Sequence, residues 1–369
     1  MRIQMISRKQ TIVLVDLGAS MGGVEAYLDS LAKILVVETD LYALVAMKDL
    51  EEKLRARGVK VLRVPLFRRI RLLRFLVGAA ALIYLLLRYR IQVVQINGFL
   101  EAILLVPARL LGRKTVYTRH GPFELDLFPW YRKPHKYLPR MFSRYGAHLA
   151  SRLVCVSETV GSLCRPLFPE GHIEVIPNWI SRLPEQNLKD VDEDGPLLVI
   201  CAGRLEKYKG VQLLIEAAKG LQGVVINILG DGDYRNQLMQ MADSADVRFL
   251  GFQKDIDSWF CRADIFVMPS MGPEGLPMVA IEAMSHGLPC IFSDLPVHRE
   301  ITDDGRGALL FCNGDVADLR SKLQLLISCK DERRRIGKYA FELIRSKYSE
   351  PAVRAAYLNL FAFAGSPQS

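Results

Sequence analysis

Short apolar segments alternate with helix-length segments along the whole 369-residue chain, and this rhythm restricts the fold more than any other feature. Each apolar segment has five to seven residues, the length of a buried strand, and the stretches between them are long enough for a helix. Because parallel strands need such crossovers, the rhythm predicts an α/β fold with helices on both faces of parallel sheets. The segments are 11–17, 43–47, 60–65, 93–97, 115–120, 152–157, 197–203, 224–230, 247–251, 264–270 and 289–294.

One polar stretch interrupts this rhythm near the middle of the chain. Residues 184–196, PEQNLKDVDEDGP, have no periodic apolar face, which predicts an interdomain linker. The chain length also favours about two domains. We therefore expect one Rossmann-like domain at 1–183, a second at 197–349 and a terminal helix within 350–369. Sheets of this kind bind ligands beyond the carboxyl ends of their strands.

The positive charge is concentrated in the first half of the chain. Residues 1–180 hold 27 Lys and Arg against 14 Asp and Glu, a net charge of +13, whereas the remainder carries −4. The first half should therefore meet an anionic partner. Its basic residues are not interleaved with aromatic residues in an RNA-binding motif, so nucleic acid is not the expected partner.

The seven cysteines are odd in number and scattered, and no C-x-x-C pair occurs. This pattern predicts neither a disulfide framework nor a zinc site, and it favours a reducing cytoplasm. The first apolar run, TIVLV, is too short for the core of a signal peptide.

Two carboxylates eight positions apart, Glu274 and Glu282, mark the segment 268–294, MPSMGPEGLPMVAIEAMSHGLPCIFSD. Pro277 suits the first turn of a helix, whose N–H groups and dipole favour an anion. A phosphate seat between two hydroxyl-binding carboxylates fits a nucleotide-sugar. An ordinary helix start with two solvated glutamates is the alternative. The backbone N–H groups that would bind the phosphate are those of Gly275, Leu276 and Met278.

A basic loop, GRLEKYKG, follows the strand segment 197–203. Arg204 offers a planar fork and Lys209 a point charge, and together they would neutralise the charge that develops on a diphosphate leaving group. A solvated basic loop is the alternative reading of the residues alone.

Together, GRLEKYKG and the Glu-x7-Glu segment resemble motifs of the retaining glycosyltransferases of the GT-B fold, most of all glycosyltransferase family 4. The resemblance extends over most of the chain, and its specific motifs lie between Gly203 and Asp294. It implies two Rossmann-like domains that face each other across a cleft. The N-terminal domain would bind the acceptor and the C-terminal domain the nucleotide-sugar, and the last helix would cross back to the N-terminal domain.

The resemblance also implies roles for individual residues. Arg204 and Lys209 would grip the donor diphosphate, Glu274 the sugar hydroxyls and Glu282 the ribose hydroxyls, with His120 near the reacting carbon. The glycine loop LGASMGGVEAYL would approach the donor phosphates, and Phe252 would pack either on the base or in the core. The implied nucleotide-sugar contacts therefore also include Gly22, Gly23, Gly203 and Gly230.

Two Asp-x-Asp patterns, 231–233 and 255–257, imitate a metal-binding motif of the other glycosyltransferase fold. GT-B enzymes commonly need no metal, so the resemblance implies no metal and no cofactor besides the donor substrate.

A long segment, 66–90, joins an arginine-rich start to 13 uncharged residues. As a helix those 13 residues reach about 20 Å, short of the roughly 30 Å of a bilayer core, so the segment should not span a membrane. Basic residues beside bulky apolar ones suit an anionic membrane surface, and a solvated helix start is the alternative. The basic residues concerned are Arg68, Arg69, Arg71 and Arg74.

These observations predict a retaining glycosyltransferase that moves a hexose from a UDP- or GDP-sugar to a lipid-linked glycan in cell-surface polysaccharide biosynthesis. It would act as a peripheral protein on the cytoplasmic face of the cell membrane. The alternatives are a nucleotide-sugar epimerase of the same fold and a non-catalytic sugar-nucleotide-binding subunit.

Overall fold

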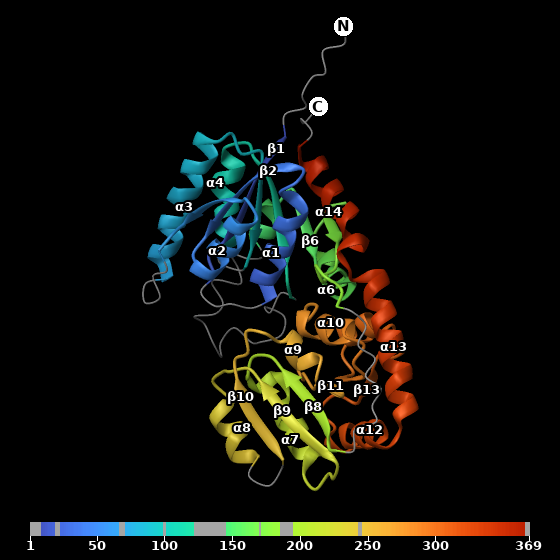
Figure 1. Cartoon of the computed structure of the whole chain (residues 1–369). Helices are drawn as coiled ribbons and strands as arrows, with labels where there is room; N and C mark the ends of the chain where they lie inside the picture. The colour runs from blue at the N-terminus through green and yellow to red at the C-terminus, as the bar shows by residue number, and fades with distance from the viewer. Residues whose placement is uncertain are drawn as a thin grey trace. The chain divides into compact units, whose positions relative to one another are not determined.

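The computed structural model describes residues 9–18, 23–65, 71–98, 101–121, 145–169, 171–184, 195–242 and 246–365 (Figure 1). The chain divides into two compact units: unit 1 comprises 1–178 and 353–369, and unit 2 comprises 179–352. Each unit contains one parallel sheet, which confirms the predicted α/β class with two Rossmann-like halves.

The sheet of unit 1 has seven parallel strands in the order β3-β2-β1-β4-β5-β6-β7. The order reverses between β1 and β4, the point at which doubly wound sheets usually bind ligands. The strands are β1 (Gln10–Asp16), β2 (Thr39–Val45), β3 (Lys60–Arg63), β4 (Val93–Asn97), β5 (Lys114–Arg119), β6 (Arg152–Cys155) and β7 (Ile173–Val175).

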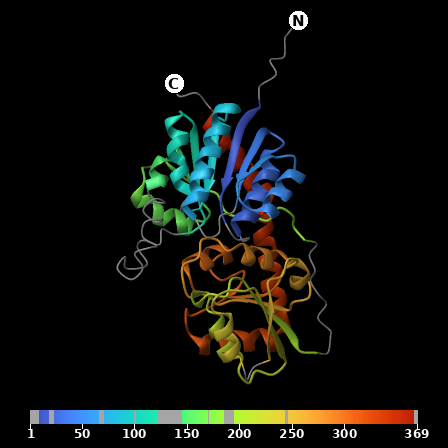
Figure 2. The ribbon, with the colours of Figure 1, turned by 90° about the vertical axis from the view of Figure 1, so that its left-hand side faces the viewer.

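Helices cover both faces of this sheet (Figures 1 and 2). Val13 and Val15 of β1 pack into a core with α3 and α4, whereas the alternate residues Ile12 and Leu14 are buried on the opposite face. On that face, the ring of Tyr27 in α1 lies 6.2 Å from the ring of Tyr357 in α14. The helices are α1 (Gly23–Leu35), α2 (Lys48–Ala56), α3 (Arg71–Arg88), η1 (Glu101–Leu104), α4 (Leu105–Leu110), α6 (Glu158–Cys164), η5 (Arg165–Leu167) and α14 (Glu350–Gly365).

The sheet of unit 2 has six parallel strands in the order β10-β9-β8-β11-β12-β13, and its order reverses between β8 and β11. Its strands are β8 (Leu197–Ala202), β9 (Val224–Leu229), β10 (Val247–Gly251), β11 (Ile265–Met268), β12 (Cys290–Ser293) and β13 (Leu309–Phe311). Its helices are η6 (Lys207–Lys209), α7 (Val211–Ala218), α8 (Arg235–Met241), α9 (Asp257–Phe260), α10 (Met278–Ser285), α11 (Pro296–Thr302), α12 (Val316–Ser328) and α13 (Lys330–Lys347).

Three strands differ most from the sequence prediction. β2 begins at Thr39, four residues before the expected 43–47, because a polar pair at its start still pairs with β1. β7 and β13 were not predicted. Each has three residues and stands at a sheet edge, so neither shows a periodic apolar pattern.

The prediction that Arg74 contacts a membrane surface is wrong, because this residue is only 6% exposed. Residues 74, 78 and 82 recur every four positions and therefore share one face of α3, which packs toward the core. At Gly78, a Cβ would lie 2.4 Å from Leu17 Cδ1, so this face approaches the end of β1 closely. The Arg74 charge also counteracts the burial that raises the pKa of Asp16. Arg74 is therefore an internal cation.

The positions of Arg68 and Arg69 lie outside the described residues, as does the side chain of Arg71. Among the residues that the structure does describe, no helix combines the length and the hydropathy that a membrane span requires.

Candidate active site

An ion pair lies where the strand order of unit 2 reverses. Lys209 ends η6, just after β8, and Glu274 lies in the loop after β11. Lys209 Nζ is 2.6 Å from Glu274 Oε1, and the two side chains are 19% and 9% exposed. Parallel strands that diverge in chain order leave a crevice at this point, so the topology delivers both charges to the expected edge.

A hydroxyl group that was not predicted from the sequence also holds Glu274. Ser270 Oγ donates a hydrogen bond to Glu274 Oε1 at 2.8 Å. Ser293 Oγ donates to the carbonyl of Ser270 at 2.5 Å, and His298 Nδ1 lies 2.7 Å from the carbonyl of Ser293. Burial lowers the pKa of His298, while its bond to Ser293 acts in the opposite direction. This chain of buried, neutral groups, Ser270, Ser293 and His298, therefore fixes the orientation of the Glu274 carboxylate.

The two loops that carry Lys209 and Glu274 are joined by backbone contacts. The carbonyl of Tyr208 accepts the N–H groups of Met271 and Gly272, at 2.7 Å and 3.2 Å. Gly210 has a φ of +71°, and a Cβ at this residue would lie 1.8 Å from the carbonyl oxygen of Pro269. Any side chain at position 210 would force the loops apart, and with them the ion pair.

A similar close approach joins the ends of β8 and β9. A Cβ at Gly230 would lie 1.9 Å from the carbonyl oxygen of Gly203. The missing side chain at position 230 therefore accommodates the backbone of the neighbouring strand end.

Arg204 lies near this site on its exposed side. Its side chain is 70% exposed, and it bonds to Glu206 Oε1 at 2.6 Å and to Tyr208 Oη at 3.2 Å. The guanidinium is thus held by residues of its own loop, with room to reorient toward a ligand.

α10 begins at Met278, and Pro277 is its N-cap residue, one position earlier than the expected first turn. In the described part of the chain, no side chain caps this helix start. Leu276 is buried, and Gly275 follows Glu274 directly. The first N–H groups of α10 therefore lie a few residues from the carboxylate of the ion pair.

Glu282 lies half-buried on α10. Burial, with a smaller contribution from the charge of Asp257, raises the pKa of Glu282 to about 7. The carboxyl group is thus poised to change its charge near neutral pH. Phe252, which follows β10, is 65% exposed, so it is not part of the core.

In unit 1, His120 directly follows β5 at the carboxyl edge of the sheet. Its Nε2 lies 3.0 Å from Asn97 Oδ1, and its ring packs edge-on against Tyr27 with 4.7 Å between ring centres. Burial, reinforced by the neighbouring Arg119 charge, lowers the pKa of His120 to about 3. The imidazole is therefore neutral at physiological pH, and its Nε2–H donates to Asn97.

A network of neutral polar groups supports His120. Gln95 Nε2 donates to Asn97 Oδ1 at 3.0 Å and to Thr118 Oγ1 at 2.9 Å, and Tyr27 Oη lies 3.2 Å from the same Thr118 oxygen. The sequence analysis missed these residues. Part of a usable signal was present, since Gln95 interrupts the apolar run of β4 and Asn97 ends it. Thr118 lies in a strand with several polar residues, so it carries no such signal.

The glycine loop is only partly described. Gly22 lies outside the described residues, whereas Gly23 begins α1. Just before this loop, Asp16 Oδ1 accepts the N–H of Gly18 at 2.8 Å.

The predicted site residues thus fall into two sets. Arg204, Lys209, Glu274 and Glu282 belong to unit 2, and His120 and Gly23 belong to unit 1.

In the two Asp-x-Asp patterns, the first carboxylates serve local turns. Asp231 Oδ1 accepts the N–H of Gly232 at 2.8 Å, and Asp255 Oδ1 accepts the N–H of Ser258 at 3.2 Å.

Two family models match this chain and together cover most of it. The model for glycosyl transferases group 1 matches residues 185–343, and the model for glycosyltransferase family 4 matches residues 21–182.

Individual relatives agree with these models. The lipopolysaccharide core biosynthesis glycosyltransferase LpsD of Rhizobium meliloti is 31% identical over 216 residues, which are 57% of this chain. The matched region spans 63% of LpsD, less than two-thirds of that protein. An Escherichia coli enzyme, UDP-Gal:α-D-GlcNAc-diphosphoundecaprenol α-1,3-galactosyltransferase, is 28% identical over 302 residues, 75% of this chain and 76% of its own.

Among solved structures, Anabaena HepE in complex with UDP superposes with a TM-score of 0.80 at 18% identity. The superposition covers 96% of this chain and all of HepE, which shows a shared GT-B fold. From the two family models, the relatives and this fold, the chain belongs to the glycosyltransferase group 1 and family 4 proteins.

Proposed function

We propose that this chain is a retaining glycosyltransferase that moves a hexose from a nucleoside-diphosphate sugar to a lipid-linked glycan in cell-surface polysaccharide biosynthesis. The observation that carries the proposal is the Lys209–Glu274 ion pair at the strand-order reversal of unit 2. A cation and a carboxylate in direct contact match the two ends of the donor bond, a diphosphate on one side and sugar hydroxyls on the other.

In the proposed site, Lys209 keeps one N–H on Glu274 and turns its other two toward the diphosphate, where Arg204 joins it. Glu274 accepts hydrogen bonds from sugar hydroxyls, and Glu282 accepts them from the ribose. His120 supplies a neutral imidazole near the reacting carbon. The remaining donor contacts are assigned to Gly22, Gly23, Gly203, Gly230, Phe252, Gly275, Leu276 and Met278.

The proposed reaction needs no covalent intermediate on the protein. The bond between the anomeric carbon and the diphosphate oxygen breaks, and the acceptor oxygen attacks the same face. The acceptor proton passes to the departing phosphate oxygen. Lys209 and Arg204 stabilise the negative charge that grows on this oxygen, so their contribution is larger in the transition state than in the ground state.

The relatives support the donor and the pathway. HepE was crystallised with UDP, the E. coli relative is a UDP-galactose-dependent galactosyltransferase, and LpsD is a lipopolysaccharide core enzyme. A uridine diphosphate sugar is therefore the first donor to test, followed by a GDP-sugar.

Calorimetry with a panel of UDP- and GDP-sugars tests the proposal. We expect one donor to bind, Lys209→Ala to weaken that binding, and NMR to show the donor's anomeric configuration kept in the product. Binding without transfer to any lipid-linked acceptor would favour the non-catalytic subunit. Conversion of the donor to its epimer without an acceptor would favour the epimerase.

We also propose that the protein acts as a peripheral protein at the cytoplasmic face of the membrane. Arg68, Arg69 and Arg71 remain the candidate headgroup contacts, and Arg74 is withdrawn because it is buried. Leu76, which is exposed, lies five residues after Arg71 in α3. Replacing the three arginines by Ser should reduce co-sedimentation with anionic vesicles at low salt, by about 1 kcal/mol per charge. Undiminished co-sedimentation would remove these arginines from the proposal.

A further inference from the structure

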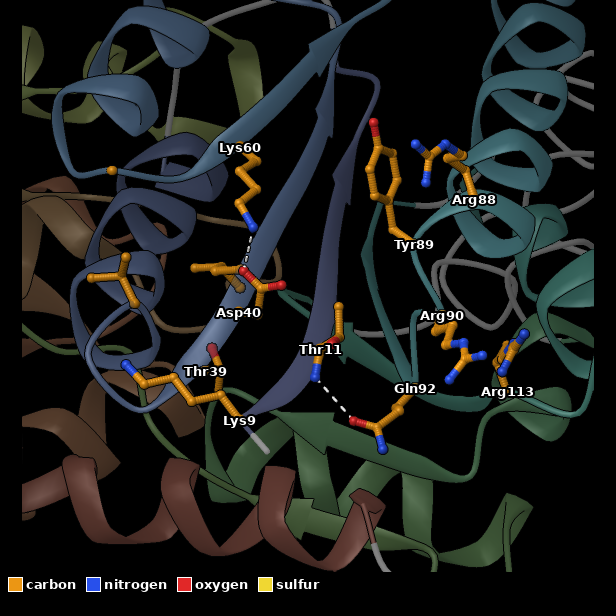
Figure 3. Close-up of a pocket in the computed structure, with 13 residues that line it drawn as sticks. Lys9, Thr11, Thr39, Asp40, Lys60, Arg88, Tyr89, Arg90, Gln92 and Arg113 are labelled. Atoms are coloured by element: carbon orange, nitrogen blue, oxygen red, sulfur yellow. Dashed lines mark hydrogen bonds and ion pairs between the residues drawn. The ribbon is translucent and has the colours of Figure 1, made fainter. Parts of the chain in front are cut away.

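A cavity in unit 1 opens at the amino edge of the sheet, the end opposite His120 (Figure 3). Its volume is about 1050 Å³. β1 has seven residues, so at about 3.3 Å per residue roughly 20 Å of strand separates the two edges. The cavity is lined by the starts of β1, β2 and β3 and by the turns before β4 and β5.

The lining is strongly cationic. It includes one carboxylate, Asp40, which is already paired with Lys60 at 2.5 Å. That hydrogen bond raises the pKa of Lys60, so this pair contributes no net charge. Four further cations remain: Lys9, Arg88, Arg90 and Arg113.

The three arginines form one wall of the cavity, opposite Lys9, Asp40 and Lys60 (Figure 3). Among the described residues, none of these arginines takes part in an ion pair. Arg113 Nη2 makes one long bond, 3.4 Å, to the carbonyl of Leu86, and Arg88 lies over the ring of Tyr89. Like charges gathered without a carboxylate repel one another unless an anion joins them.

The backbone contributes to this arrangement. Arg90 has a φ of +50°, a left-handed conformation that is uncommon for a residue with a side chain. This turn follows the end of α3 directly and places Arg90 beside Arg113 (Figure 3). Gln92 completes the floor: its Oε1 accepts the N–H of Thr11 at 3.0 Å, which leaves its amide N–H groups for a ligand.

We propose that this cavity is a second anion site, for a ligand that carries at least two negative charges on phosphate groups. An arginine guanidinium group can donate two parallel hydrogen bonds to two oxygens of one phosphate. Two or three guanidinium groups on one wall therefore favour a diphosphate or clustered phosphates over a single carboxylate. The volume admits a diphosphate with a further group attached. The phosphates come either from a soluble compound or from the headgroups of an anionic lipid. The proposal rests on unit 1 residues alone and does not depend on the proposed transferase activity.

The first experiment uses inorganic pyrophosphate as the probe. The full-length Lys209→Ala/Arg204→Ala protein removes the candidate donor site, and calorimetry then measures what binding remains. We expect one remaining site that Arg90→Gln/Arg113→Gln weakens at least tenfold. Arg109→Gln, at an exposed arginine of α4 outside the cavity, is the matched control and should leave the affinity unchanged.

The second experiment separates the two sources. Vesicles of phosphatidylcholine with and without phosphatidylglycerol are sedimented with the same proteins. If lipid headgroups are the source, the anionic vesicles retain the protein and the Arg90/Arg113 double variant releases it. If the source is soluble, only pyrophosphate binding responds to the double variant. Binding of neither probe, or a correctly folded double variant that binds both pyrophosphate and anionic vesicles as the parent protein does, would overturn the proposal.

Discussion

The carboxyl edges of the two sheets have the same topology but opposite chemistry. In unit 2 the edge carries a charged pair, Lys209 and Glu274, joined at 2.6 Å. In unit 1 the edge carries mostly neutral amide, hydroxyl and imidazole groups around His120, whose pKa is lowered to about 3 by burial and by the neighbouring Arg119 charge. One edge is suited to a charged diphosphate and the other to neutral hydroxyl groups. A shared fold therefore leaves the chemistry to the few residues that follow each strand.

The largest expected effect tests the charged edge. Lys209→Ala and Arg204→Ala should each lower kcat by about 10² or more, because each removes charge aimed at the leaving diphosphate. Steady-state kinetics with the accepted donor measures the change. Lys207→Ala, in the same short helix but exposed, is the control and should be close to wild type. Near-normal turnover in either variant would show that the charged edge does not bind the diphosphate.

Substitution of His120 in unit 1 should lower turnover less than the substitutions in unit 2, and His120 should not contribute to the pH dependence of the reaction. His120→Ala should lower kcat by about tenfold, since one positioned hydrogen-bonding group is lost. Because the pKa of His120 lies near 3, the pH profile of kcat/KM should contain no inflection from this residue between pH 5 and 8. An NMR titration that finds His120 protonated at pH 6 would contradict the assigned neutral state.

The raised pKa of Glu282 can be tested through the pH dependence of donor binding. Its free pKa is about 7, and ribose hydroxyls donate to the ionised form, so donor binding should release a proton and weaken as the pH falls below 7. At pH 6 only about a tenth of the carboxyl groups are ionised, so we expect roughly tenfold weaker binding than at pH 8 or above, where nearly all of them are ionised. Calorimetry in buffers of different ionisation enthalpy measures the released proton. Glu282→Gln should bind donor with no such pH dependence, and a wild-type protein that behaves the same way would refute the ribose role.

The smallest expected effect is none at all. Transfer should continue at an unchanged rate in EDTA, because in the proposed site the cations of unit 2 and the start of α10 would offset the diphosphate charge. Loss of activity in EDTA that Mn²⁺ restores would instead direct attention to the carboxylates at 231–233 and 255–257.

The sequence predicts those features of this molecule that neighbouring residues determine, and it does not predict those that depend on contacts between distant elements. The strand ends before Arg204, before Glu274 and at His120 were predicted, because apolar runs that stop at polar residues mark the edge of a parallel sheet. The partnership of Ser270 with Glu274 was not, since serine follows strands for many reasons. The Arg74 prediction failed because an arginine in an amphipathic segment is usually exposed, and its internal carboxylate, Asp16, lies on another element. The lowered pKa of His120 likewise depends on packing between elements, which no local sequence pattern reveals.

The ion pair of unit 2 has a consequence for how turnover ends. Glu274 pairs with Lys209 directly, so a departing nucleotide would not leave this cation without a partner. In the proposed site the lysine keeps this partner throughout, which should lower the cost of releasing product. In Glu274→Gln this partner is neutral, and a nucleoside diphosphate should dwell longer on the protein. We therefore expect the glutamate to set the strength of product inhibition by the nucleotide, separately from its proposed contact with the sugar.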